Sequence, residues 1–232
     1  MPELVFDGVD YVADSNRVLG PVDLRLECSG ITAVLGANGA GKSLFLGLAQ
    51  GMLIPSTGSV TWDGQNAHAT RNNRSIVFQS PTVLRRSVFD NVAFALNATG
   101  RSQDADSRVE HWLERVELAD RIKTPAAALS GGEGQRMALA RALVTNPQVV
   151  LMDEPSSNLD PKSTAQLERI AVDIAASGVP ILIATHDIAQ AKRLAQTVVF
   201  FDQGQITEIT PAAEFFAAPR SGGANRYLEG LL

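Results

Sequence analysis

The sequence has little cysteine and no long apolar stretch. Cys28 is the one cysteine among 232 residues, so no disulfide can form within the chain, and no Cys and His cluster has metal-ligand spacing. We expect Cys28 to be a small buried hydrophobic residue. No apolar run reaches the roughly 18 residues that a membrane-spanning helix requires. The first ten residues carry three acids and no basic side chain, unlike a signal peptide. These absences predict a cytoplasmic chain that reaches a membrane only through partner chains.

Positive charge is also in short supply. Lys and Arg number 20 against 25 Asp and Glu, a net charge of −5. Because no positive field would gather phosphates, this balance argues against a general nucleic-acid binder. Hydrophobic residues are 45% and charged residues 19% of the chain, as in ordinary globular proteins. We therefore expect one large folded domain or two small ones, without long disordered tails or coiled-coil rods.

Short β-branched apolar runs alternate with helix-like stretches, which predicts an α/β fold with a mainly parallel sheet covered by helices. Residues 4–26 mix polar and apolar side chains, with turn signals at Asp14-Ser15-Asn16 and Gly20-Pro21, and favour an N-terminal antiparallel β layer. Helical spacing at 87–97 and 104–118 predicts an inserted α-helical subdomain. The expected buried strands are 31–35, 75–78, 149–152, 181–184 and 198–201.

The strongest motif is a glycine-rich loop. Gly36-Ala37-Asn38-Gly39-Ala40-Gly41-Lys42-Ser43 follows the predicted strand 31–35 and precedes a helix-like stretch, which is the context of a phosphate loop. Its glycines allow successive backbone N–H groups to point at phosphate oxygens, Lys42 adds positive charge near the β and γ phosphates, and the Ser43 hydroxyl can ligate Mg²⁺. The loop predicts a nucleoside triphosphate as ligand.

A second phosphate-handling element is the apolar strand 149–152 followed by two acids. The carboxyl end of a buried parallel strand lies at the ligand crevice of its sheet. There, Asp153 would hold the Mg²⁺ shell and Glu154, on the opposite side, could polarise the attacking water. Two acids after an apolar run are weak evidence alone, but together with the phosphate loop they indicate an ATPase site.

A third segment separates one class of ATPases from the rest. Leu129-Ser130-Gly131-Gly132-Glu133-Gly134-Gln135-Arg136 resembles the signature motif of ATP-binding cassette (ABC) ATPases. The likeness covers essentially the whole chain: the phosphate loop, Gln79, the signature, Asp153-Glu154, Ser157-Asn158-Leu159-Asp160 and His186 follow in the family's order. Ser130 and Gly132 stand before a predicted helix, 133–144, whose free N–H groups can bind a γ-phosphate.

The resemblance implies further roles. Gln79 is similar to the Q-loop glutamine near Mg²⁺ or the attacking water, and His186 to the switch histidine that contacts the γ-phosphate. Asp160 resembles the D-loop aspartate, and Tyr11 is the candidate for stacking on adenine. The alternatives are purely structural roles: Tyr11 as a packed tyrosine of the β layer, and His186 as a core histidine whose hydrogen bonds are satisfied. The implied catalytic residues are Glu154, His186, Gln79 and Lys42, and the implied Mg²⁺ ligands are Ser43, Gln79 and Asp153. The implied nucleotide-binding residues are Tyr11, Gly36, Asn38, Gly39, Ala40, Gly41, Lys42, Ser43, Leu44, Ser130, Gly131, Gly132, Gln135 and Asp160.

The resemblance also implies how the chain is divided. A single ABC domain, 1–232, would consist of a RecA-like core, 1–80 and 146–232, and an α-helical subdomain at about 81–145. Two positions depart from the common family pattern: Leu44 replaces a second hydroxyl residue, and Gly134 lies in the first turn of the signature helix, where an exposed Gly costs roughly 0.5–1 kcal/mol relative to Ala. Neither change removes a catalytic group, so an active ATPase is expected.

Several residues without a motif are given ordinary structural interpretations. His68 and His111 are expected on the surface, and Met52, Met137 and Met152 in the core. Residues 221–224, Ser-Gly-Gly-Ala, are expected to be flexible.

Three function classes compete: the ATP-hydrolysing subunit of a membrane importer, a soluble cassette ATPase that assembles cofactors or acts on ribosomes or DNA, and a non-catalytic binding module. Glu154 and His186 disfavour the third. Residues 80–92, including Arg85-Arg86, resemble the segment that receives a coupling helix of the membrane subunit in importers. That segment and the closing residues 214–216 and 227–230 are most similar to oxyanion importers, of the tungstate type first and the phosphate type next. The implied partners are ATP, a second copy in a head-to-tail homodimer, and membrane permease subunits at the inner face of the cell membrane.

Overall fold

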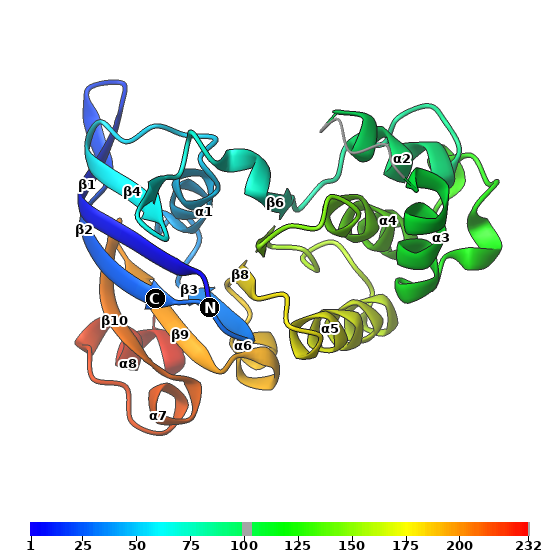
Figure 1. The fold of residues 1–232 in the computed structure, drawn as a ribbon. Helices are drawn as coiled ribbons and strands as arrows, with labels where there is room; N and C mark the ends of the chain where they lie inside the picture. The colour runs from blue at the N-terminus through cyan, green and yellow to red at the C-terminus, as the bar shows by residue number, and fades with distance from the viewer. Residues whose placement is uncertain (99–103, 232) are drawn as a thin grey trace.

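Two β-sheets organise the chain in the computed structural model, which describes residues 1–98 and 104–231 (Figure 1). A four-stranded antiparallel sheet has the order β2-β1-β4-β5, and a six-stranded sheet has the order β10-β9-β3-β8-β7-β6. The strands of the first sheet are β1 (Glu3–Ala13), β2 (Asn16–Glu27), β4 (Thr57–Trp62) and β5 (Gln65–Asn66). Those of the second are β3 (Ile31–Leu35), β6 (Arg74–Val77), β7 (Val149–Asp153), β8 (Ile181–Thr185), β9 (Thr197–Asp202) and β10 (Gln205–Pro211). The predicted α/β fold with an N-terminal antiparallel layer is confirmed.

The six-stranded sheet is parallel except for β10, which pairs antiparallel with β9. Each predicted buried strand is present, with ends that agree to within one residue. Strands β3, β7, β8 and β9 are largely apolar and buried on both faces, which is the pattern of a parallel sheet covered by helices, whereas β6 at the sheet edge is only partly buried. Their carboxyl ends meet at one edge of the sheet, which is where the predicted site residues follow.

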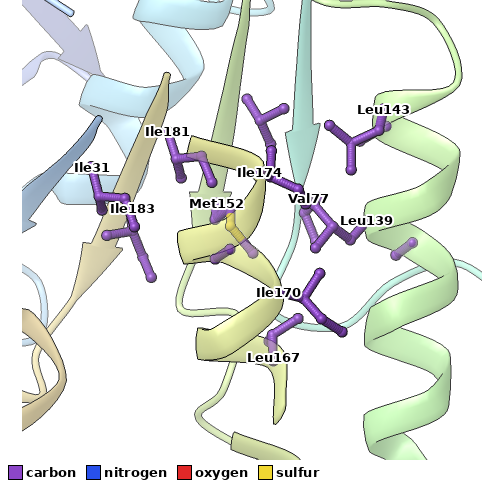
Figure 2. Packing of buried hydrophobic residues seen from close by; sticks show 14 of the residues in the cluster. Ile31, Val77, Leu139, Leu143, Met152, Leu167, Ile170, Ile174, Ile181 and Ile183 are labelled. Carbon is purple, nitrogen blue, oxygen red and sulfur yellow. The ribbon is translucent and has the colours of Figure 1, made fainter. Parts of the chain in front are cut away.

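Alternate residues of the central strands enter two different hydrophobic clusters. In β8, Ile181 and Ile183 face one cluster and Leu182 and Ala184 the other. The first cluster includes α4 (Gly131–Leu143) and α5 (Pro161–Ala176), whose apolar side chains cover the sheet (Figure 2). The second contains α1 (Lys42–Gln50) and the antiparallel sheet. Since side chains alternate along a strand, one sheet supports both cores.

The inserted helices gather at one side of the molecule (Figure 1). They are α2 (Val88–Ala98) and α3 (Ala105–Arg115), which pack against each other and against α4. Val109 and Leu113 of α3 and the following Val116 are fully buried, and Trp112 is half-buried, as the i, i+3, i+4, i+7 spacing predicted. The first hydrophobic cluster continues from these helices to the sheet, so the division at about 81 and 145 stays a prediction; residues 99–103 of that range lie outside the described residues.

The first sheet contains one correction. Asp14 and Ser15 form the predicted turn between β1 and β2, with left-handed φ of 48° and 66°. Gly20 and Pro21, by contrast, lie inside β2 and not at a turn. β2 is an edge strand, and its pairing with β1 shifts register between Val9 and Tyr11, so a residue without an N–H is tolerated there.

The chain ends in two short helices beside β9 and β10, α7 (Ala212–Ala217) and α8 (Gly222–Leu228), while α6 (Ile188–Leu194) follows β8. The expectation of a flexible segment at 221–224 is wrong. The Ser221 hydroxyl accepts a hydrogen bond from the Ala224 N–H at 3.1 Å, and Ala224 is fully buried, so capping and burial together order α8.

Single residues outside the motifs mostly match expectation. Cys28, Met137 and Met152 are buried and His68 and His111 are exposed, but Met52 is 52% exposed, against the expected core position. Met52 follows the Gly51 that ends α1, so its side chain lies beyond the buried helix face. None of the described helices combines the length and apolar character that a bilayer crossing needs.

Candidate functional site

The glycine-rich loop joins β3 to α1 and bends tightly against the sheet. A Cβ at Gly36 would lie 2.4 Å from the carbonyl oxygen of Phe201, so no other residue fits this close approach. Gly41 caps α1 in a left-handed conformation, with φ 104°. It offers no side chain to the helix, and the first turn of α1 has no acidic residue. The N–H groups of this turn therefore remain available to an anion.

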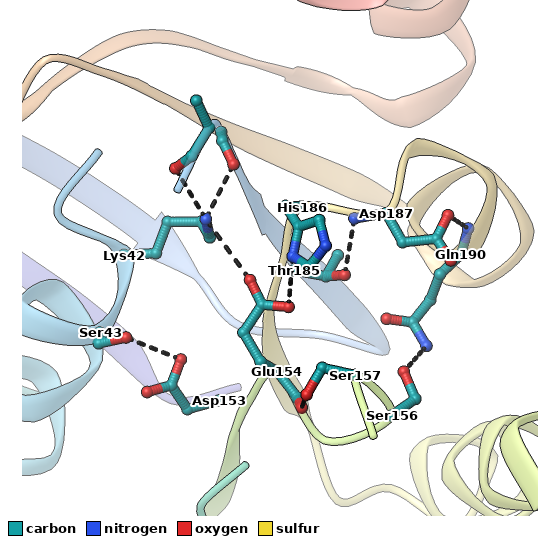
Figure 3. Close-up of polar contacts among 12 residues, drawn as sticks. Lys42, Ser43, Asp153, Glu154, Ser156, Ser157, Thr185, His186, Asp187 and Gln190 are labelled. Atoms are coloured by element: carbon teal, nitrogen blue, oxygen red, sulfur yellow. Dashed lines mark hydrogen bonds and ion pairs between the residues drawn. The ribbon is translucent and has the colours of Figure 1, made fainter. Parts of the chain in front are cut away.

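Lys42 begins α1 and points back along the loop. Its ammonium donates hydrogen bonds to the carbonyl oxygens of Gly36 at 2.8 Å and Ala37 at 3.0 Å, and lies 3.5 Å from Glu154 Oε1 (Figure 3). Burial lowers the pKa of Lys42, and the neighbouring Glu154 opposes that shift. The fold therefore holds this ammonium where it meets the carboxyl end of β7.

The acid that ends β7, Asp153, and the acid that follows it, Glu154, point to different partners. The Ser43 hydroxyl donates to Asp153 Oδ1 at 3.0 Å, and burial raises the pKa of the Asp153 carboxyl. Glu154 has a left-handed φ of 46°, and its Oε2 lies 2.8 Å from His186 Nδ1, just after β8 (Figure 3). The structure thus brings Lys42, Ser43, Asp153, Glu154 and His186 into one cluster.

The signature segment forms the N-terminus of α4, which has a side-chain cap, unlike the N-terminus of α1. Ser130 caps α4: its hydroxyl accepts from the Glu133 N–H at 3.3 Å, and Glu133 Oε2 accepts from the Ser130 N–H at 2.8 Å. Gly131 and Gly132 already belong to the helix, which begins two residues earlier than predicted. Gly134 is buried and not exposed as expected, although a Cβ added there would meet no atom within 4 Å.

Gln135 has a position that contradicts its predicted role as a nucleotide ligand. Its side chain is 2% exposed. The amide donates to the carbonyl oxygens of Phe78 at 3.1 Å, Gln79 at 3.3 Å and Pro155 at 2.8 Å. Gln135 therefore ties α4 to the segments that follow β6 and β7.

The remaining predicted site residues lie on three separate segments. Gln79 is exposed after β6. Asp160 caps α5, and hydrogen bonds from Ser163 lower the pKa of its carboxyl. Tyr11 lies half-buried on β1 against the second hydrophobic cluster, a position compatible with both interpretations given above.

Sequence reasoning missed a buried polar network next to the cluster. Gln190 of α6 donates to Ser156 Oγ at 2.7 Å and to Glu168 Oε1 at 3.2 Å. Glu168 of α5 also accepts hydrogen bonds from Arg193 Nε at 2.9 Å and from Arg193 Nη2 at 2.6 Å. Helical spacing could have placed Glu168 on the buried face of α5, but nothing in the sequence names its partners on α6.

Comparison with known proteins identifies the family of this chain. The model of the ABC transporter family matches residues 19–157. The chain is 36% identical to the phosphate import ATP-binding protein PstB of Bacteroides thetaiotaomicron, with 92% of each chain covered, and 36% identical to that of Bacteroides fragilis, with 92% of this chain and 91% of that one covered. The chain belongs to the ABC transporter family. It is therefore an ATPase that uses ATP with Mg²⁺.

Solved structures agree with this ABC assignment. The cbiO1 protein of Clostridium perfringens, described as part of the ABC transporter complex cbiONQ, is 28% identical with a TM-score of 0.84 over 93% of this chain and 90% of that one. A bacterial Atm1-family ABC exporter with ATP bound shares the fold, with a TM-score of 0.82 and 23% identity; this chain spans 42% of its length.

The donor set of this ABC ATPase fits Mg²⁺. Ser43 and Asp153 offer a hydroxyl and a carboxylate 3.0 Å apart, and Mg²⁺ prefers such oxygen ligands together with substrate phosphates. Burial of Asp153 disfavours its charged form, and a divalent cation would compensate for that cost. When bound, the ion neutralises charge on the β and γ phosphates.

Proposed function

We propose that the chain is the ATP-hydrolysing subunit of an importer for a tetrahedral oxyanion and acts through separate membrane permease subunits. The 36% identity to phosphate import proteins over nearly the whole chain carries this proposal. The relatives' names favour phosphate, and the short segments quoted above favour tungstate. The alternative is a soluble ABC ATPase that serves cofactor assembly or another cytosolic process.

Glu154 is the proposed general base of hydrolysis. It follows β7 at the sheet edge, within contact distance of both Lys42 and His186. A carboxylate held there can accept a proton from a water that attacks the γ-phosphate, while His186 Nδ1 holds its other oxygen. Lys42 neutralises phosphate charge, and Ser43, Asp153 and Gln79 are the proposed holders of the metal.

The second proposed half of the site is the start of α4 in another copy. Ser130, Gly131 and Gly132 would contact the γ-phosphate bound to the first copy, with Asp160 at the junction. In support of this, Ser130 and Asp160 make their hydrogen bonds within their own helix starts, and none of these bonds ties them to Lys42 in the same chain.

A groove lined by β6, α2 and α4 supports the permease contact. Its lining includes Ile76, Leu84 and Phe94, with Phe94 44% exposed. Val83 beside it is 38% exposed, whereas Leu84 is half-buried. We take this groove as the docking surface for a helix of the membrane subunit, since an apolar surface of this kind stays exposed until its partner arrives.

The segment at the rim of this groove is held rigidly. The buried Asn91 side chain accepts from the Leu84 N–H at 2.8 Å and donates to the carbonyl oxygens of Leu84 at 3.1 Å and Ser87 at 2.9 Å. Arg85 and Arg86 are therefore presented at the surface by a fixed loop, a geometry suited to a partner chain.

The test is the charge reversal Arg85→Glu with Arg86→Glu, compared with Leu84→Asp. We expect unchanged ATP hydrolysis by the isolated subunit, because none of these residues lies at the nucleotide cluster, but loss of oxyanion uptake by cells and of co-purification with a permease. Uptake of phosphate and of tungstate is measured in the same cells. The double reversal Arg25→Glu with Lys192→Glu, at exposed positions of β2 and α6 outside the groove, serves as the charge-matched control. Uptake that persists in the groove variants would favour the soluble ATPase.

A further inference from the structure

The C-terminal helix α8 places a tyrosine hydroxyl behind the site. Tyr227 Oη donates to the carbonyl oxygen of His186 at 2.7 Å and lies 3.4 Å from the carbonyl oxygen of Gly36. A hydroxyl has one proton, so the shorter contact, to His186, is the stronger bond. One side chain from the end of the sequence thus touches the backbone of both the phosphate loop and the histidine.

These contacts close a ring of interactions around the site. One half of the ring consists of side-chain pairs: Lys42 pairs with Glu154, and Glu154 pairs with His186. The other half runs through backbone carbonyl groups. Lys42 Nζ donates to the Gly36 carbonyl, and this carbonyl lies next to Tyr227 Oη. Tyr227 Oη in turn donates to the His186 carbonyl. The peptide of His186 is therefore held from behind while its imidazole faces Glu154.

The tyrosine itself is firmly placed. Its ring packs on Phe200 of β9 with centroids 5.3 Å apart, and the residue is 7% exposed. The loop before α8 is fixed by buried Glu208, whose Oε2 accepts from the N–H groups of Arg220 and Ser221, both at 2.9 Å. Burial raises the pKa of Tyr227 to about 12, so the hydroxyl remains a donor across the physiological range.

We propose that Tyr227 is a positioning residue, whose hydroxyl fixes the backbone of His186 relative to the phosphate loop and so sets the distance between the imidazole and Glu154. This inference rests on the proposed role of His186 in ATP hydrolysis. A residue that acts in this way affects the rate at which bound ATP reacts more than the affinity for ATP, since misplacement of a catalytic group by a fraction of an ångström slows the reaction.

The test is Tyr227→Phe, which removes the hydroxyl and keeps the ring on Phe200. We expect kcat to fall about 3–10-fold with KM for ATP within about twofold of wild type. Loss of one buried hydrogen bond would lower Tm by about 2–4 °C, so the variant stays folded. The control is Phe216→Leu, because Phe216 is half-buried against Phe215 in the same C-terminal segment. That control should lower Tm while kcat is unchanged.

A spectroscopic arm separates positioning from general stability. The chain has three histidines, so labelled imidazole signals of His68, His111 and His186 can be followed by NMR and assigned through His186→Ala. Tyr227→Phe should move the His186 signals and leave those of His111 unchanged, whereas Phe216→Leu should move neither.

Unchanged His186 signals, or an unchanged kcat in folded Tyr227→Phe, would overturn the inference. If His186→Ala itself kept most of the ATPase activity, the proposed role of His186 would fail instead. The two failures are distinguishable because the NMR signals report the link between Tyr227 and His186 without any turnover.

Discussion

Helices α1 and α4 both begin at glycine-rich segments, yet their first turns are completed in different ways. α1 starts at a left-handed glycine, without a capping side chain and without an acid in its first turn. α4 starts at a full capping box, in which the Glu133 carboxylate occupies the N–H of Ser130 and pairs with Arg121 at 3.2 Å. The start of α1 is open to an anion, whereas the start of α4 already holds a carboxylate of its own.

This difference suits the N-termini of α1 and α4 to different roles. The start of α1 lies in the cluster with Lys42, Asp153 and Glu154, which supports the proposal that it binds phosphate within one chain. The capped end is stable by itself and presents Ser130 at its tip, which suits a surface that is completed only against a second copy. Four experiments would break or sharpen the comparison.

Disruption of the open end should have the largest effect. Lys42→Ala should weaken ATP binding at least tenfold, because the proposed partners of its ammonium are phosphates in the ground state. Glu154→Gln should keep the affinity within about threefold and lower kcat about 10²–10⁴-fold, because its proposed role is in the transition state. Isothermal titration and phosphate release measure the two quantities. Equal losses of affinity in both variants would show that these roles are assigned wrongly.

The capped end should matter through a second copy. With ATP, Glu154→Gln should become dimeric on size-exclusion chromatography, because the proposed closed dimer would form while its bound ATP would not be hydrolysed. Addition of Ser130→Arg should abolish that dimer. Ser107→Arg is the matched control, since Ser107 is exposed in the first turn of α3. A dimer that survives Ser130→Arg would refute a role of the signature segment between copies.

The Glu133 carboxylate that caps α4 should make the free energy of unfolding depend on pH in the acidic range. The hydrogen bond from the Ser130 N–H lowers the pKa of Glu133, so Glu133 contributes stability above its unfolded pKa of about 4.3, and this contribution disappears as the pH falls through the lower folded value. Glu133→Gln should therefore cost about 0.3–1 kcal/mol at pH 7 and flatten the loss of stability below about pH 4. Urea unfolding at several pH values measures this, and parallel curves for the two proteins would contradict it.

The smallest expected effect is a gain of stability inside α4. A Cβ at Gly134 would meet no atom within 4 Å, and its φ lies outside the left-handed region. Gly134→Ala should thus stabilise the isolated chain by about 0.5–1 kcal/mol, because alanine loses less backbone freedom on folding. A thermal shift of opposite sign would mean that the turn is more crowded than its geometry indicates.

Sequence patterns anticipated the features that depend on near neighbours. The five buried parallel strands, the phosphate loop and the start of α4 follow from short spacings, and each is where it was expected to within two residues, whereas β4, β5 and β10 were not anticipated. The errors concern contacts between distant segments. The inward position of Gln135 depends on the segments after β6 and β7, and that of Pro21 on a bulge with β1.

Tyr227 illustrates the same limit for the site. Its partner His186 lies 41 residues away and is reached through a backbone carbonyl, for which no side-chain pattern exists. The Gln190 and Glu168 contact likewise joins two helices that are distant in the sequence, α6 and α5, and has no local sequence pattern. Such second-layer positions become visible only when the chain is folded.

The alternation of the central strands between two clusters limits how this protein can change in length. Ile181 and Ile183 face one cluster, and Leu182 and Ala184 the other. Removal or insertion of a single residue within β8 would turn each later side chain of the strand to the opposite face of the sheet, so that it would point into the wrong hydrophobic cluster. Length variation is therefore tolerable in the connections between strands, whereas within the central strands only substitutions that respect the size of each face can accumulate.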